Sequence, residues 1–206
     1  MKSKNIIILL VIAVGMATIL YTVYGSKDQT AYINEINKHR DGLETFMRTS
    51  PESPFAEDPS KFKGLKFFPA DLKYKITATL TPIENKKQIL LATNDGKEQR
   101  YREYAYAEFD LSGFRNKLLL LEVIDPGPDM GKLFLAFGDG TSAESTYGAG
   151  RYLDVAKSQG ANTITLDFNK AYNPYCAYAE KFSCPLPPSE NLLTIPIQAG
   201  EKNYEN

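Results

Sequence analysis

The pattern of apolar and polar positions changes twice along the chain. Residues 6–24 form an apolar run without a charge, and apolar residues then recur at spacings of three and four from Asp28 to about Arg48. Beyond Pro51 and Pro54 the apolar positions alternate with period two. These three patterns predict a hydrophobic helix, an amphipathic helix ended by the prolines, and a region of β-strands.

The apolar run is long enough to cross a lipid bilayer. As a helix, residues 6–24 would rise about 28 Å, close to the hydrocarbon thickness of a membrane. Lys2 and Lys4 precede the run, whereas the charges of Lys27 and Asp28 after it cancel. Since positive flanks stay in the cytoplasm, residues 1–26 are predicted to be a signal-anchor. The membrane is the expected partner of this segment, and the rest of the chain is expected outside the cytoplasm. We therefore expect a single-pass cell-membrane protein.

A cleaved signal peptide is the alternative interpretation of the same segment. Val23-Tyr24-Gly25 offers a cleavage site near Gly25, which would release a periplasmic or secreted protein. The run exceeds the usual signal-peptide core, and the bulky Tyr21 and Tyr24 crowd the site, so an uncleaved anchor is favoured. Under both interpretations, residues 27–206 are predicted to form a single mostly-β domain.

Short alternating segments separated by glycine and proline predict the fold class. The expectation is a mainly β fold, a sandwich or small barrel of about seven strands with an N-terminal amphipathic helix, preceded by the membrane segment. Asn94-Asp95-Gly96 predicts a hairpin between two of the strands. The strands are expected at residues 74–80, 88–93, 98–111, 118–124, 133–137, 162–168 and 192–197.

Charge and cysteine content exclude several function classes. With 24 Lys and Arg against 25 Asp and Glu, the chain has no basic excess for nucleic acid. In an exported domain, Cys176 and Cys184 are expected to form a disulfide, with free thiols as the alternative. Two thiolates and the single histidine, His39, cannot complete a structural zinc site, so no metal is predicted. Gly148-Ala149-Gly150 lacks the Lys-Ser/Thr of a phosphate loop, and no cofactor is predicted.

Residues 138–191 are dense in Gly, Tyr, Asn and Pro, a composition typical of long binding loops. Arg151 could hold a carboxylate or phosphate in a bidentate fork, tyrosines could stack on a ligand, and asparagines could orient it. Alternatively, Arg151 pairs with Asp154 or Asp167 and holds two loops together. The candidate ligand-binding residues are Tyr147, Arg151, Tyr152, Asn169, Tyr172 and Asn173.

Three segments of this region carry a resemblance to a known family. They are Gly150-Arg151-Tyr152-Leu153-Asp154, Asp167-Phe168-Asn169 and Ala171-Tyr172-Asn173-Pro174. The chain from about Ala31 to Glu201 resembles a bacterial family of unknown function, DUF1684. The resemblance implies relatives of similar architecture, and it supplies no activity.

Two functions are predicted from these residues. The first is a non-catalytic cell-envelope module that binds a small-molecule or envelope ligand, or serves a structural role. The second is a hydrolase acting on an envelope substrate, with Asp154, Asp167 or Glu190 as acid or base and Arg151 as an electrostatic clamp. No catalytic motif is present, because a Ser-His-Asp triad would need the distant His39.

Overall fold

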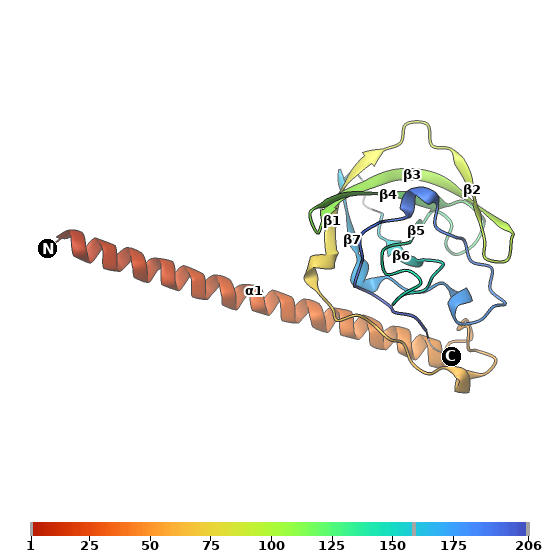
Figure 1. The fold of residues 1–206 in the computed structure, drawn as a ribbon, viewed down its shortest axis with the longest axis horizontal. Helices are drawn as coiled ribbons and strands as arrows, with labels where there is room; N and C mark the ends of the chain where they lie inside the picture. Colours follow the sequence, from red (N-terminus) through yellow and green to blue (C-terminus); the bar gives the residue numbers. More distant parts are fainter. Residues whose placement is uncertain (1, 158–159, 205–206) are drawn as a thin grey trace.

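The first helix is continuous across both predicted helical segments. A computed structural model describes residues 2–157 and 160–204, with the side chains of residues 2–14 and 17–27 left out. Helix α1 (Lys2–Thr49) ends just before Pro51, as the sequence predicts. Its C-terminal part lies against the domain, and its N-terminal part extends away from it (Figure 1).

Most residues of the predicted membrane segment have side chains that lie outside the described part of the structure. These residues are 6–14 and 17–24 of helix α1. Within the described part of the chain, no helix is long and apolar enough to cross a membrane. The membrane anchor therefore stays a prediction.

The domain is one curled antiparallel sheet, a half-barrel, and not a sandwich of two sheets. The strands follow the order β6-β5-β4-β3-β1-β7, and β2 pairs with β3. The long β3 carries β4 along one edge and shares its other edge between β2 and β1. The strands are β1 (Lys75–Pro82), β2 (Gln88–Ala92), β3 (Glu98–Leu111), β4 (Phe114–Val123), β5 (Leu133–Phe137), β6 (Arg151–Val155) and β7 (Thr163–Asp167).

Six of the seven predicted strands are confirmed, and the seventh is wrong. Residues 192–197 form no strand, because their backbone bonds are divided between the chain just after β5 and buried side chains. The N–H of Leu193 donates to the carbonyl of Gly138 at 2.8 Å, and the carbonyl of Ile195 accepts from Gly140 at 3.0 Å. The carbonyl of Ile197 accepts from Arg151 at 3.0 Å, and its N–H donates to Asp139 at 3.1 Å. Strand β6 lies where the sequence predicts a loop. The sequence does not reveal this strand because Arg151, Tyr152 and Leu153 are all buried and show no apolar-polar alternation.

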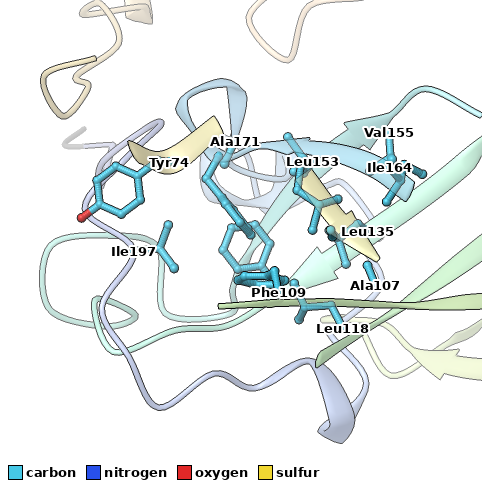
Figure 2. Packing of buried hydrophobic residues seen from close by; sticks show 14 of the residues in the cluster. Tyr74, Ala107, Phe109, Leu118, Leu135, Leu153, Val155, Ile164, Ala171 and Ile197 are labelled. Atoms are coloured by element: carbon cyan, nitrogen blue, oxygen red, sulfur yellow. The ribbon is translucent and has the colours of Figure 1, made fainter. Parts of the chain in front are cut away.

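The main core lies on the inner side of the curl. Phe109 of β3, Leu118 of β4, Leu135 of β5 and Leu153 of β6 converge there, as Figure 2 shows. Ile197 of the C-terminal segment covers part of the same core. Because successive side chains of a strand point to opposite faces, the alternate residues of these strands face outward.

Helix α1 docks on the sheet through its second half. Ile36 is fully buried, and Met47 packs with Phe55 and Phe62 of the following loop. Glu44 accepts a hydrogen bond from the backbone N–H of Leu65 at 2.5 Å. These contacts confirm the predicted apolar stripe of this helix.

Candidate functional site

The outer face of the sheet carries a cleft of about 1000 Å³. Strands β3 to β6 form one side of it, and residues 172–185 of the following loop form the other. Tyr152 and Asp154 of β6 line the cleft, whereas Arg151 and Leu153, which alternate with them along the strand, lie in the interior. The alternation of a β-strand therefore decides which residues of this motif a ligand can reach.

Aromatic rings line much of the cleft. Tyr101 and Phe134 stack with centroids 5.1 Å apart, and Tyr152 meets the edge of Phe134 at 4.8 Å. Tyr172 lies edge-on to Tyr152 at 6.0 Å. Offset and edge-to-face pairs of this kind hold one another in place, so the lining is preformed.

The tyrosine hydroxyls of the cleft are bonded to the protein. Tyr152 donates to the carbonyl of Pro185 at 2.7 Å, and Tyr172 donates to Asp154 at 2.9 Å. Burial raises the pKa of both phenols far above the ordinary value, and it raises the pKa of Tyr101 to about 12. These tyrosines are therefore neutral, and their rings form part of the cleft wall.

Asp154 is the exposed carboxylate of the cleft. The two lysines of the lining are engaged elsewhere, Lys132 with Asp129 and Lys157 with Glu122, each at 2.7 Å. Among residues 2–157 and 160–204, no cationic side chain forms an ion pair with Asp154. The cleft thus combines ring faces with one negative charge that lacks a counterion of its own.

Arg151 lies outside the cleft, with 1 % of its side chain exposed. Its guanidinium donates to Asp139 at 2.8 Å and to the carbonyls of Ile197, Ala199 and Glu201. The predicted pairing with Asp154 or Asp167 is therefore wrong, because Asp139 takes that place. A ligand could reach Arg151 only after the C-terminal segment had moved, so its ligand role stays a prediction.

Asn173 is also buried, and it holds the same C-terminal segment. Its side-chain amide donates to Glu201 at 2.9 Å, and its backbone N–H donates to the other carboxylate oxygen at 3.0 Å. Tyr178 donates to Glu201 at 2.6 Å. Burial raises the pKa of Glu201 to about 7 in spite of these donors. Arg151 and Asn173 together form what we call the C-terminal clamp, with Asp139 and Glu201 as their carboxylate partners.

Asn169 and Asp167 connect the sheet to helix α1. The hydroxyl of Tyr32 donates to Asp167 at 2.7 Å, and the amide of Asn169 donates to the Tyr32 oxygen at 2.9 Å. Asn169 also exchanges hydrogen bonds with the backbone of Asp71. Both side chains are buried, so the geometry places them in the helix-sheet contact.

The remaining predicted residues lie apart from the cleft lining. Glu190 is exposed in the turn Ser189–Asn191 and accepts a weak hydrogen bond from Tyr106 at 3.4 Å. Tyr147 is half-buried, and its hydroxyl donates to the sulfur of Cys176 at 3.7 Å. Of the nine candidate residues, the cleft brings together Tyr152, Tyr172 and Asp154.

The two cysteines are neighbours, and both are free thiols in this structure. The backbone N–H of Cys176 donates to the sulfur of Cys184 at 3.2 Å. Their proximity agrees with the expected pairing, and the disulfide itself stays a prediction. Among the described residues, no cluster of three or more His, Cys, Asp or Glu could hold a metal ion.

Sequence reasoning missed part of the cleft and part of the clamp. Phe134 belongs to a confirmed strand, and its parity on β5 places it opposite the core. Tyr101 shares the parity of the core residue Phe109 and reaches the cleft only because of a β-bulge between Glu103 and Ala105, which the sequence does not reveal. Tyr175 and Phe182 on the opposite wall carried no such signal. Asp139 and Glu201 carried none either, because acidic residues beside glycine are typical of turns.

Comparisons with known proteins agree with the architecture. The chain is similar to an uncharacterized protein of Haloarcula marismortui whose structure was solved by NMR in solution, with 34 % identity and a TM-score of 0.64. The similarity covers 85 % of this chain and 96 % of that protein. The comparison with curated proteins gave no match. The model of the family described as "Protein of unknown function (DUF1684)" matches residues 60–202, and the chain belongs to that family.

Proposed function

We propose that this chain is a non-catalytic binding protein whose cleft takes a small organic cation with a flat apolar body. The observation that carries the proposal is the juxtaposition of the stacked rings with the unpaired carboxylate of Asp154. We further propose that residues 6–24 of α1 anchor the protein in the cell membrane, with the cleft outside the cytoplasm.

The size and lining of the cleft suit a small molecule. Ligand sites of this kind usually enclose about 300–1000 Å³ and combine apolar walls with a few polar groups. The rings of Tyr101, Phe134 and Tyr152 provide the apolar wall. Because the hydroxyl groups of Tyr101 and Tyr152 are neutral and bonded to the protein, a flat ligand would lose little by packing on this wall.

The charge of the cleft favours a cation over an anion. The face of an aromatic ring is negative, and it attracts ammonium groups by about 0.5–2 kcal/mol. Asp154 adds a full negative charge at the same wall, while Lys132 pairs with Asp129 and Lys157 pairs with Glu122, which it shares with Arg102. An anionic ligand would meet repulsion from both sources.

Binding is favoured over hydrolysis because the three candidate acids occupy different environments. Asp154 lines the cleft, Asp167 is buried beneath Tyr32, and Glu190 is exposed on a turn. Glycoside hydrolysis needs two carboxyl groups facing each other across about 5–9.5 Å. Asp129, the other carboxylate of the cleft, is held by Lys132.

The test compares three probes of similar shape and different charge: 2-phenylethylammonium, 2-phenylethanol and phenylacetate. Ligand-observed NMR on the full-length protein in lipid nanodiscs gives their relative affinities. We expect the cation to bind about five-fold or more tightly than the alcohol, which corresponds to about 1 kcal/mol, and phenylacetate to bind least.

Two variants locate the effect. Asp154→Asn should bring the cation and the alcohol within about two-fold of each other and change the unfolding free energy by less than about 1 kcal/mol. Glu84→Gln, which removes an exposed carboxylate outside the cleft, should preserve the preference. Absence of binding by all three probes would contradict the binding function.

The location is tested separately in intact cells. If the domain lies outside the cytoplasm, protease added to spheroplasts should digest it without lysis. Protection until the membrane is permeabilised would contradict this part of the proposal.

A further inference from the structure

Cys176 and Cys184 are held next to each other by two independently anchored segments. Cys176 lies in the 3₁₀ turn Tyr175–Ala177. Cys184 is tied to the turn between β2 and β3, because its N–H donates to the side chain of Asn94 at 2.7 Å and its carbonyl accepts from the N–H of Asn94 at 3.1 Å. The sulfur of Cys184 is therefore presented to Cys176 by a rigid support.

The two sulfurs are not equivalent. Cys176 is half-buried and its sulfur accepts a hydrogen bond from the hydroxyl of Tyr147 at 3.7 Å, whereas the sulfur of the buried Cys184 accepts from the backbone N–H of Cys176 at 3.2 Å. The contact with Cys184 is the main cause that lowers the pKa of Cys176 to about 7. The same contact, together with burial, raises the pKa of Cys184 far above its ordinary value. Of the two thiols, Cys176 is therefore the more exposed and the more readily deprotonated.

We propose that Cys176 and Cys184 form a redox-active dithiol that reduces disulfides, with Cys176 as the attacking and Cys184 as the resolving thiol. Cys184 also lines the cleft, but this inference does not rest on the ligand proposed for it. It differs from a permanent structural disulfide, because the bond would form and break during exchange. The substrate class is a low-molecular-weight disulfide.

The reaction is an ordinary thiol-disulfide exchange in two steps. The thiolate of Cys176 attacks one sulfur of the substrate disulfide, forms a mixed disulfide and expels the first substrate thiolate. Cys184 then passes its proton to the first expelled thiolate and attacks the sulfur of Cys176, which forms the internal disulfide and expels the second substrate thiolate, protonated in turn by water. The two protein thiols are oxidised, and the substrate disulfide is reduced to two thiols.

The asymmetry of the pair drives the second step. Once Cys176 is part of a mixed disulfide it carries no charge, so the contact that kept the proton on Cys184 is lost. Tyr147 acts as a positioning residue, since its hydroxyl stabilises the Cys176 thiolate without contacting the substrate sulfur in this arrangement.

The experiment follows reaction of the reduced full-length protein with 5,5′-dithiobis(2-nitrobenzoate) and, in parallel, with oxidised glutathione. The wild type should release a second equivalent of thiol after the first and end with Cys176 linked to Cys184 in the mass spectrum. Cys184→Ser should stop at the mixed disulfide on Cys176. Cys176→Ser should react about ten-fold or more slowly at neutral pH, because the remaining thiol is protonated.

The pH dependence tests the roles of Cys184 and Tyr147. Alkylation of Cys176 by iodoacetamide should reach half its maximal rate near pH 7 in the wild type. Tyr147→Phe should shift that midpoint upward and leave the rate at high pH unchanged, a result that a merely structural role would not give. Two results would overturn the proposal: equal reaction of both thiols with a midpoint near pH 8.5, or a Cys176–Cys184 bond that reduced glutathione cannot open.

Discussion

The C-terminal clamp and the aromatic cleft are built from the same short stretches of chain and serve opposite purposes. In β6, Arg151 faces inward to the clamp, and its neighbour Tyr152 faces the cleft. In the next stretch, Tyr172 lines the cleft, and its neighbour Asn173 binds Glu201. The motif of residues 150–154 is therefore not one site, because Arg151 holds the C-terminal segment and its neighbour Tyr152 lines the cleft.

The difference in solvent access separates the two regions physically. The clamp buries the ion pair of Arg151 and Asp139, and both groups form their hydrogen bonds with other protein groups. Removing one partner leaves the charge of the other buried without a counterion. The cleft keeps Asp154 in contact with water, so replacing it leaves no buried charge behind. Substitutions in the clamp should therefore change stability, and those in the cleft should change binding.

Replacing Arg151 should give the largest effect. Arg151→Leu leaves Asp139 buried and unpaired, so we expect the unfolding free energy to fall by about 3–5 kcal/mol in urea titrations. Arg115→Leu is the matched control, because Arg115 pairs with Glu108 and Asp110 at the surface and its loss should cost less than about 1 kcal/mol. Unchanged stability with lost binding of 2-phenylethylammonium would instead make Arg151 a ligand residue.

Gly200 tests how tightly the C-terminal segment must approach the sheet. Its φ is +75°, and an added Cβ would lie 2.6 Å from the carbonyl oxygen of Ala171 and 2.7 Å from that of Phe168. Gly200→Ala should lower the unfolding free energy by about 2–4 kcal/mol. Gly96→Ala has the same sign of φ and no neighbour within 4 Å, so it should cost about 1 kcal/mol. Equal losses would show that backbone strain, and not the close approach, accounts for the effect.

Glu201 should give the clamp a pH dependence of its own. Its pKa is about 7 in the folded protein against an ordinary value of 4.5, so the folded state keeps a proton that the unfolded state has released. Its stabilising contribution is complete below pH 4.5 and is lost as the pH rises to about 7, at about 1 kcal/mol per pH unit. Glu201→Gln should flatten this slope in urea titrations across that window.

The exposed Glu57 is the control for this slope. A hydrogen bond from Lys181 lowers the pKa of Glu57, so its linkage to pH has the opposite sign and Glu57→Gln should not flatten the slope. A slope that persists in Glu201→Gln would assign the proton uptake to another group.

The regular alternation of the sheet was readable from the sequence, and the irregular contacts were not. Strand β3 has the ends that the sequence predicts, although a bulge between Glu103 and Ala105 reverses its alternation, so that Tyr101 faces the cleft and Phe109 the core. Strand β6 has five residues, and both of its faces are buried, so its pattern shows no period. The segment 192–197 looks like a strand because its apolar side chains fill the core, although its backbone bonds are shared among Gly138, Gly140 and, at Ile197, the side chains of Arg151 and Asp139.

The candidate site was predicted in part for the same reason. Tyr152, Tyr172 and Asp154 were chosen for their chemistry, and so were Arg151 and Asn173, which the structure buries. Chemistry alone cannot separate the two groups. The separation requires knowing that Arg151 begins a strand, since that fixes which neighbours share its face.

By itself, the sequence determined the docked amphipathic helix, the six strands and the β2–β3 hairpin. Each of these depends on the spacing of apolar residues or on a turn formed by near neighbours. Only the tertiary structure decided that Asp139 and the C-terminal carbonyls take Arg151, and that one face of β6 opens on the aromatic cleft. These contacts join residues far apart in the chain, and their partners are chosen by packing and by the need to satisfy buried charge, which no local pattern records.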